Sequence, residues 1–336
     1  MDDLTRYRMR VVAVVAISLF AALVARLWYL QVITTEQAVA VAEQNVIREI
    51  RVTAPRGRIL DVQGRVLVGN RITTMVTINR REFDQAGFDE EQRLQVLTRI
   101  AIEVNRSGNE LLKTIDIEAA LEDPAYGLYD DVPVAVDVGE DLLIFFGERS
   151  DQYPGIRVVD STVRSYLYGN LASHLLGWVG PLNDTEYRNR RPPGGKDYAL
   201  RDEVGKAGIE LLFEDDLRGV AGGRVVEVDR LGRIVRERDD LFLAPIPGDD
   251  VVLTIDIDLQ YLVETELERA VFAARSREPE RDPDSDEDPP DFDAPGGAVV
   301  VLAPASGDVL AMGSYPSYDP NESIGGFRVD RWNELN

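Results

Sequence analysis

An apolar segment near the N-terminus constrains this 336-residue chain more than any other feature of its sequence. Residues 11–25, VVAVVAISLFAALVA, carry no charge, and after Arg26 the apolar segment continues through residues 27–33. The whole stretch has about the length that a helix needs to cross a hydrocarbon core of ~30 Å. The sequence therefore predicts a single transmembrane helix at residues 11–33, behind a short tail at residues 1–10.

The charges beside this segment predict its orientation. Arg6, Arg8 and Arg10 precede it, and basic residues concentrate on the cytoplasmic side of membrane helices. We therefore expect a single-pass protein of the cell membrane, with a cytoplasmic N-terminus and the bulk of the chain extracytoplasmic. A cleaved signal peptide is the alternative, because Ala22 and Ala25 are small residues of the kind found before a cleavage site. The apolar segment continues past them, which favours the anchor.

Composition excludes several classes of function. Sixty acidic residues against 37 basic ones give a net charge of -23, so the chain would repel a phosphate backbone and we expect no nucleic-acid partner. There is no cysteine, which excludes disulfides, zinc thiolate sites and cysteine nucleophiles. The single histidine, His174, cannot form a multi-histidine metal site. We expect neither a metal ion nor a cofactor.

Residues 34–247 mix short helical and strand patterns without an internal repeat, which indicates an α+β fold. Residues 34–48 lack Gly and Pro and predict a helix that rises from the membrane. Gln63 and Gly64 separate two strand-like pieces, residues 58–62 and 65–68, in the pattern of a hairpin. The other predicted elements are strands at 71–78 and within 156–168, helices at 90–104, 114–121 and 142–149, and a loop at 190–197.

A Pro- and Gly-containing boundary at residues 245–248 precedes a second predicted domain, residues 248–336. Asp256 is placed to cap a helix whose apolar face repeats at helical spacing. Residues 276–295 are acidic and rich in proline, so they cannot bury a core and are predicted to form a loop. The predicted elements are a strand at 251–255, a helix at 256–275 and a hairpin of strands at 297–302 and 308–312, and the apolar helix face consists of Leu259, Leu262, Val263, Leu267 and Val271.

Gly205 and Lys206 resemble the end of a phosphate-binding loop. That loop needs Gly five positions before its last Gly and Ser or Thr after its Lys, and Leu200 and Ala207 stand there instead. A structural role for this segment is therefore the better interpretation. His174 is interpreted in the same way, because no nucleophile signature lies beside it and a general base acts on such a partner.

Three aspartates in the acidic segment, Asp282, Asp284 and Asp286, have the spacing of a calcium-binding loop. Such a loop also needs Gly at its sixth position and Glu at its twelfth, where this sequence has Glu287 and Asp293. The aspartates therefore indicate weak attraction of cations and no defined site.

Four motif-like segments follow one another along the chain: RGRILD at residues 56–61 with Gly64, HLLGWVG at 174–180, GKAGIE at 205–210 continuing through LRG at 217–219 to Gly222, and LTID at 253–256 with LQ at 259–260 and YPSYDPN at 315–321. In this order they resemble segments of class B penicillin-binding proteins, particularly of the elongation-type branch similar to penicillin-binding protein 2. Val62 and Gln63 depart from the first pattern. Trp332 and Leu335 are similar to a helix that precedes the nucleophile of the family.

The resemblance implies a pedestal, or dimerisation, domain at residues 34–247 and the start of an incomplete transpeptidase domain at residues 248–336. The family's nucleophile lies in a Ser-x-x-Lys motif, but no Ser in this sequence has Lys three positions later, and Lys-Thr-Gly is also missing. Ser107-Gly108-Asn109 resembles the family's second motif, but it precedes the transpeptidase region and is better interpreted as a turn. No catalytic residue is assigned, and we expect the chain alone to be an inactive fragment.

For the full-length protein, the resemblance implies a serine-type D,D-transpeptidase that cross-links peptidoglycan through an acyl-enzyme. Peptidoglycan stem peptides and β-lactams would be its ligands, and a polytopic cell-wall glycosyltransferase its partner. One alternative is a non-catalytic, membrane-anchored module that binds and activates that glycosyltransferase. Another is a division-type member of the family, which would act at the septum with the same chemistry.

Overall fold

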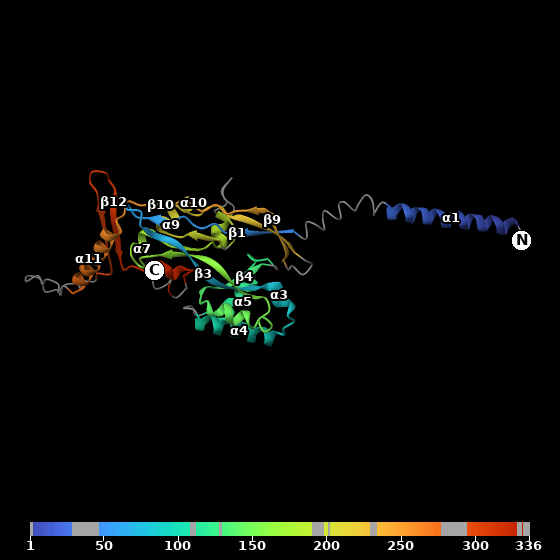
Figure 1. The fold of residues 1–336 in the computed structure, drawn as a ribbon, viewed down its shortest axis with the longest axis horizontal. Coiled ribbons are helices and arrows are strands. Elements are labelled where there is room, and N and C mark those ends of the chain that lie inside the picture. Colours follow the sequence, from blue (N-terminus) through green and yellow to red (C-terminus); the bar gives the residue numbers. More distant parts are fainter. Residues whose placement is uncertain are drawn as a thin grey trace, which may run out of the picture. The chain divides into compact units, whose positions relative to one another are not determined.

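The computed structural model divides the chain into two compact units. Unit 1 comprises residues 1–52 and 222–244, and unit 2 comprises residues 53–221 and 245–336 (Figure 1). The described residues are 3–28, 47–107, 112–127, 130–189, 198–200, 202–228, 234–276, 294–327 and 331.

Unit 1 contains helix α1 and a three-stranded antiparallel sheet in the order β1-β8-β9. Their bounds are α1 Asp3–Trp28, β1 Ile47–Val52, β8 Gly222–Val228 and β9 Ile234–Leu243. Residues 34–46 of the helix predicted at residues 34–48 lie outside the described residues. Its last two residues, Ile47 and Arg48, belong to β1, so that part of the prediction is wrong. Pairing with β8, far away in the sequence, supplies hydrogen bonds that local helix propensity cannot anticipate.

Helix α1 covers most of the predicted membrane segment. In the part of the chain that the structure describes, however, we find no helix with both the length and the apolar character needed to cross a membrane. The mixed α and β content predicted from the sequence is confirmed, and the membrane-spanning role of residues 11–33 stays a prediction.

A five-stranded sheet with a long central strand, β3, organises unit 2. β5 pairs with β3 from Val68 to Ile78, while β2 and β4 pair with the two ends of β3 and β10 runs parallel to β2. The strands are β2 Ile59–Leu60, β3 Val66–Asn79, β4 Asp131–Val138, β5 Ile156–Tyr166 and β10 Val251–Val252. The hairpin predicted at Gln63-Gly64 is confirmed, with Gly64 at φ +81°. The strand predicted at 71–78 is not separate, because Gly69 and Asn70 pair with β5 and continue β3 through the predicted gap.

A layer of short helices packs against the β3–β4 end of this sheet (Figure 1). They are α3 Arg80–Gln85, α4 Glu90–Ser107, α5 Thr114–Glu122 and α6 Asp141–Gly147. Phe83, Leu97, Ile100, Ile117 and Leu142 form the centre of their apolar core. The helices predicted at 90–104, 114–121 and 142–149 are therefore confirmed, and we call this part of unit 2 the helical layer.

The other end of the sheet carries shorter elements around a second core that includes Ile59, Tyr166, Leu217 and Ile257. β6 and β7 form a small antiparallel pair. The bounds are α7 Ser173–Leu176, β6 Val179–Pro181, α8 Asp184–Asn189, β7 Glu203–Gly205, α9 Gly208–Leu212, α10 Glu214–Leu217 and the 3-10 helix η2 Pro320–Ser323. The loop predicted at 190–197 lies outside the described residues.

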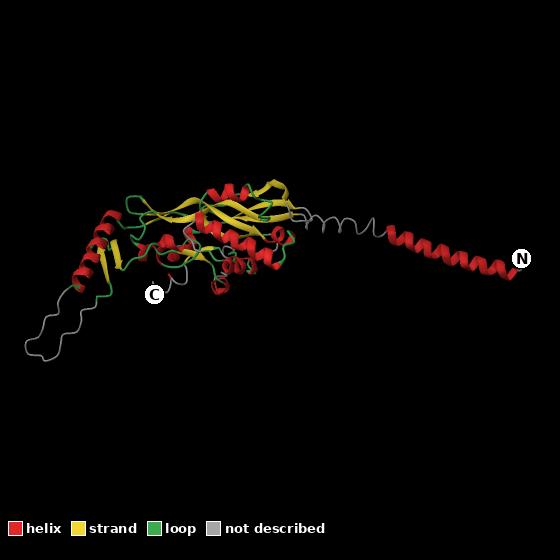
Figure 2. Ribbon diagram, turned by 90° about the horizontal axis from the view of Figure 1, so that it is seen from below, coloured by secondary structure: helices red, strands yellow, loops and turns green. Residues whose placement is uncertain are grey.

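Helix α11, Ile257–Arg275, lies alongside a hairpin of β11, Gly297–Leu302, and β12, Val309–Tyr315 (Figure 2). The predicted cap is confirmed, since the Asp256 side chain accepts hydrogen bonds from the backbone of Asp258 and Leu259. The predicted hairpin is also confirmed, whereas the strand predicted at 251–255 is limited to β10. Most of the acidic segment, residues 277–293, lies outside the described residues.

Candidate functional site

The four sequence motifs meet in unit 2, although they are far apart along the chain. The backbone N–H of Gly57 donates to the Leu217 carbonyl at 2.7 Å, and the Lys206 N–H donates to the Trp178 carbonyl at 2.9 Å. The Asn321 side chain hydrogen-bonds to both backbone groups of Tyr166 at 3.0 Å. We call this region the motif junction, and it comprises residues 56–65, 164–180, 203–217, 249–260 and 315–321.

A buried cluster of opposite charges lies at the centre of the motif junction. Arg56 donates to Glu210 and to Glu214, with both N–O distances at 2.6 Å, and Arg164 donates from Nε to the second oxygen of Glu210 at 2.7 Å. The four side chains have exposed fractions of 9% or less, so solvent screens these contacts weakly. We call Arg56, Arg164, Glu210 and Glu214 the Arg–Glu cluster.

The Arg–Glu cluster is neutral overall and holds the backbone of several motifs. Arg164 donates to the Gly57 carbonyl at 2.7 Å, and Glu214 accepts from the Gly205 N–H at 2.9 Å. Burial lowers the pKa of Arg56, but the nearby charges of Glu210 and Glu214 outweigh burial and raise the pKa above its ordinary value. Burial, followed by the charge of Glu210, raises the pKa of Tyr166 well above the usual range. The arrangement keeps Arg56 cationic and Tyr166 neutral, which suits a structural joint.

Two glycines of the motifs allow close approach of backbones. A Cβ atom on Gly205 would lie 2.0 Å from the Glu210 carbonyl oxygen. Gly177 has φ +76°, and a Cβ there would lie 1.9 Å from the Ala207 carbonyl oxygen. Only glycine fits these positions without displacement of the backbone. The glycines of the second and third motifs are therefore explained by packing, in agreement with the structural interpretation of Gly205.

A second, more exposed network joins the β2–β3 turn to α11. The Asp61 carboxylate, which is fully buried, accepts from the backbone N–H of Gln63 at 3.0 Å and of Arg65 at 2.8 Å, and from Arg65 Nε at 2.7 Å. Arg65 also reaches Asp258 at 2.7 Å and Asp256 at 3.3 Å. Burial raises the pKa of Asp61, but the Arg65 side chain and the backbone donors outweigh burial and lower it. We call Asp61, Arg65, Asp256 and Asp258 the Asp61–Arg65 network.

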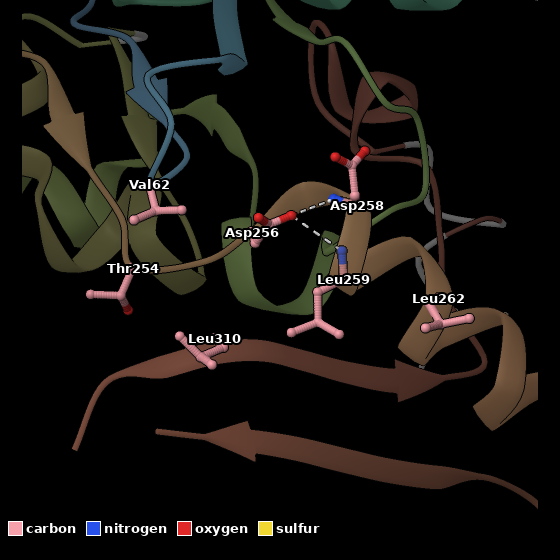
Figure 3. Close-up of a pocket in the computed structure, with 7 residues that line it drawn as sticks. All are labelled: Val62, Thr254, Asp256, Asp258, Leu259, Leu262 and Leu310. Carbon is pink, nitrogen blue, oxygen red and sulfur yellow. Dashed lines mark hydrogen bonds between the residues drawn. The ribbon is translucent and has the colours of Figure 1, made fainter. Parts of the chain in front are cut away.

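An open hollow of about 480 Å³ lies beside this network (Figure 3). Its walls are apolar except for a threonine and two aspartates, and they consist of Val62, Thr254, Asp256, Asp258, Leu259, Leu262 and Leu310. Leu262, predicted to lie on the apolar face of the helix, has an exposed fraction of 55% and lines this hollow. The hollow can hold an apolar group, but its lining offers no nucleophile with an adjacent base.

His174 joins α7 to the segment after β12. Its Nε2 atom lies 2.9 Å from the Pro316 carbonyl oxygen, which accepts the hydrogen bond, and its ring packs edge-on against Tyr318. Glu264 of α11 accepts from the backbone N–H of Ala172 at 2.9 Å, next to the same helix, and burial raises the pKa of Glu264. These contacts give His174 a place in the packing of the motif junction.

The other partial motifs are not assembled into sites by the described residues. Lys206 pairs with Glu186, and Ser107 donates to Asp141. Gly108, Asn109 and the aspartates at 282, 284 and 286 lie outside the described part of the chain. Within that part, no group of three or more potential ligands is placed to hold a metal ion. Two members of the Arg–Glu cluster, Arg164 and Glu214, were not singled out from the sequence.

A family model of the penicillin-binding protein dimerisation domain matches residues 51–253. The peptidoglycan D,D-transpeptidase MrdA of Escherichia coli strain K12 is 30% identical over 315 residues, which cover 93% of this chain and 43% of that protein. MrdA of Acinetobacter baumannii is 27% identical over 334 residues, with coverage of 98% and 43%. The chain thus spans less than half the length of these curated relatives.

Solved structures show the same fold. A complex between penicillin-binding protein PBP2 and MreC from Helicobacter pylori contains a chain with a TM-score of 0.61 at 21% identity, and the match covers 86% of this chain and 47% of that one. A chain of a peptidoglycan synthase complex, solved for the structural coordination of polymerization and crosslinking, has a TM-score of 0.53 at 27% identity, with coverage of 98% and 49%. Residues 51–253 include the Arg–Glu cluster and most of the motif junction. The chain therefore belongs to the class B penicillin-binding proteins, whose dimerisation domain it carries.

Proposed function

We propose that this chain is the N-terminal part of a peptidoglycan D,D-transpeptidase and that its motif junction acts as the rigid base of that enzyme. The observation that carries the proposal is the family match over residues 51–253, which spans the convergent motifs. The printed names of relatives such as MrdA of Escherichia coli support the reaction class. The division into a pedestal at 34–247 and the start of a transpeptidase domain at 248–336 is part of the proposal.

In the proposed reaction, a serine attacks the amide between the two D-Ala residues of a stem peptide, and the C–N bond breaks to give an acyl-enzyme and free terminal D-Ala, which leaves with the serine proton. The amine of a second stem peptide then attacks the acyl-enzyme, forms the cross-linking amide and returns a proton to the serine. β-Lactams would acylate the same serine. No serine among the 336 residues has a lysine three positions later, so no residue of this chain is assigned to these steps. The role of the chain is to support the residues that perform them.

The test is a gel of native membranes labelled with fluorescent penicillin and probed with an antibody against residues 53–221. We expect an antibody-positive band that carries the label and is larger than the 336-residue chain. Pre-incubation with unlabelled penicillin is the control and must remove the label. An antibody-positive band without label would contradict the proposal.

A second candidate function is a non-catalytic module that binds and activates a cell-wall glycosyltransferase. This candidate is favoured by the similarity, at 27% identity, to a chain of a peptidoglycan synthase complex whose structure concerns the coordination of polymerization and crosslinking. Co-purification of a polytopic glycosyltransferase with this chain would support the candidate, provided that the antibody-positive band carries no penicillin label. A labelled band would favour the transpeptidase function, with the glycosyltransferase as the partner of the enzyme.

We also propose that residues 11–33 anchor the protein in the cell membrane, with the bulk of the chain outside the cytoplasm. The uncharged run at residues 11–25 and the arginines before it support this proposal. Alkaline extraction of membranes should leave the chain in the pellet, and deletion of residues 11–33 should release it. Sidewall labelling by the antibody would favour a role in elongation, whereas labelling confined to the septum would favour division.

A further inference from the structure

The N-terminal end of α11 is capped by Asp256, and the β2–β3 turn holds this capping residue. The first N–H groups of a helix have no partners within the helix and need acceptors from elsewhere. Asp256 accepts two of them, from Asp258 at 2.9 Å and from Leu259 at 3.3 Å. The Asp256 carboxylate that accepts them is itself paired with Arg65 of the β2–β3 turn at 3.3 Å, and Arg65 is held by Asp61 at 2.7 Å. The β2–β3 turn therefore holds the residue that caps the helix.

Asp61 is held firmly enough to position what it binds. Its carboxylate is fully buried and takes hydrogen bonds from Gln63 and Arg65 within its own turn. The turn is closed by the backbone, since the Asp61 N–H donates to the Arg65 carbonyl at 2.9 Å and the Gly64 N–H donates to the Asp61 carbonyl at 3.0 Å. A negative charge fixed at the N-terminal end of a 19-residue helix is also favoured by the helix dipole.

Arg65 and Gln63 extend the same turn across the first residues of α11. Arg65 reaches Asp256 and Asp258, and the Gln63 side chain donates to Asp256 at 2.9 Å. The backbone N–H of Val62 donates to the Ile255 carbonyl at 3.0 Å. Asp258 has an exposed fraction of 80%, so its pair with Arg65 is weak, and the connection runs mainly from the buried Asp61 through Arg65 to Asp256.

The capped end of α11 in turn holds the hairpin. Asp256 donates its backbone N–H to the Leu310 carbonyl at 3.0 Å. One turn later, the buried side chain of Gln260 donates to the Met312 carbonyl at 2.7 Å and accepts from the Met312 N–H at 2.8 Å. A shift of the first turn of α11 would therefore displace β12.

We propose that Asp61 and Arg65 are positioning residues that fix α11, and through it the β11–β12 hairpin, on the β2–β3 turn. They take no part in bond making. The connection inside this chain stands on the contacts above, and its effect on acylation rests on the proposed transpeptidase function. Two separate measurements therefore test the two parts.

The first measurement is amide hydrogen exchange of the 336-residue chain, with Asp61→Asn and Arg65→Met compared with the parent. We expect exchange in the first turn of α11 and in β12 to become up to about tenfold faster in both variants, because Asp61 holds Arg65 and Arg65 holds the capping residue Asp256. Exchange in α4 should not change. Arg65→Lys keeps the charge and should restore part of the protection.

The matched control is Arg58→Met. Arg58 makes a bidentate pair with Asp250, the residue before strand β10, and has no hydrogen bond or ion pair with the described residues of α11. This variant should leave exchange in α11 and β12 at the level of the parent. If Asp61→Asn leaves α11 unchanged, or if it speeds exchange in α4 to the same extent, the positioning role is wrong.

The second measurement is the rate at which fluorescent penicillin labels the native, membrane-bound protein that carries the same substitutions. We expect slower labelling of Asp61→Asn than of Arg58→Met. If neither the parent nor any variant is labelled, the proposed function fails while the exchange result still decides the connection. If all are labelled at equal rates, the proposed function holds and the effect of Asp61 on acylation is refuted.

Discussion

The helical layer and the motif junction stand at opposite ends of the same sheet and are stabilised in different ways. The helical layer buries apolar side chains such as Leu97 and Ile100, which follow one another at helical spacing. The motif junction buries the charged Arg–Glu cluster and brings backbones together at Gly205. Apolar burial is tolerant of shape, whereas ion pairs and backbone contacts require a defined geometry.

This difference indicates which region fixes the relative positions of distant segments of the chain. A joint between segments distant in sequence has to fix their relative positions. An apolar core of similar size would define these positions less closely, because apolar contacts have no preferred direction. Replacement of buried ion pairs by apolar residues is often neutral for stability, so stability alone does not explain the cluster. We infer that the motif junction is built for position and the helical layer for stability.

The largest effect is expected for Glu210→Ala. The change leaves Arg56 and Arg164 buried with fewer acceptors, and loss of one partner of a buried ion pair costs about 3–5 kcal/mol. Urea unfolding followed by far-UV circular dichroism measures the change. Glu237→Ala is the control, because Glu237 forms an exposed pair with Arg224 and its loss should cost at most about 1 kcal/mol. A loss below about 1 kcal/mol for Glu210→Ala would refute the importance of the cluster.

The next effect is expected in the helical layer. Leu97 is fully buried, and its replacement by Ala removes apolar contacts and leaves a cavity, at a cost of about 2–5 kcal/mol. Leu94→Ala on the same helix, where the side chain is 49% exposed, should cost about 0.5 kcal/mol or less. Amide exchange of α4 and of β7 locates the damage. If Leu97→Ala speeds exchange in β7 as much as in α4, the two regions do not behave differently.

A smaller effect is expected for Gly205→Ala. The added methyl group would meet the Glu210 carbonyl oxygen, and such overpacking costs about 1–3 kcal/mol. Gly147→Ala is the control, because a Cβ atom there has no neighbour within 4 Å. Differential scanning calorimetry of the two variants should show a lower Tm for Gly205→Ala alone. Equal Tm values would mean that the backbone contact in the motif junction yields without cost.

Local patterns were sufficient to predict much of the fold. The apolar spacing that predicts α4 and the position of the capping residue Asp256 can be recognised in short stretches of sequence, and the structure contains both the helix and the cap. Ile47 and Arg48 were assigned to a helix because their local sequence has no helix breaker, yet they form β1 through pairing with β8. Gly69 and Asn70 belong to β3 because β5 continues beside them. The errors therefore arise where a distant strand decides the conformation.

The motif junction was harder to predict because its contacts join segments that the sequence separates. Arg56 and Glu210 were noticed as members of two motifs, but their pairing spans 154 positions. Arg164 lies between them, and its only signal is a charged residue inside a predicted strand. With 60 acidic and 37 basic residues, the number of possible pairs is too large for charge alone to select one. Only the fold shows that these four side chains meet.

The smallest effect concerns pH and separates Asp61 from the many other carboxylates. Its pKa is lower in the folded chain than the ordinary value of 3.8, because its hydrogen bonds outweigh burial. Ionised Asp61 therefore stabilises the fold above pH 3.8, and this contribution is lost as the pH falls through the lower folded-state pKa. We expect the difference in unfolding free energy between the parent and Asp61→Asn to be constant near neutral pH and to shrink below pH 3.8.

Urea unfolding of both proteins at a series of pH values measures this difference directly. Other carboxylates titrate in both proteins alike, so subtraction removes their contribution. Asp258→Asn is the matched control, because Asp258 also contacts Arg65 but is largely exposed, and its difference from the parent should be small at neutral pH. If the Asp61→Asn difference instead grows as the pH falls, the carboxylate destabilises the fold when ionised. Asp61 could then not be the fixed support of Arg65, and position in this part of the motif junction would depend on the exposed contacts of Arg65.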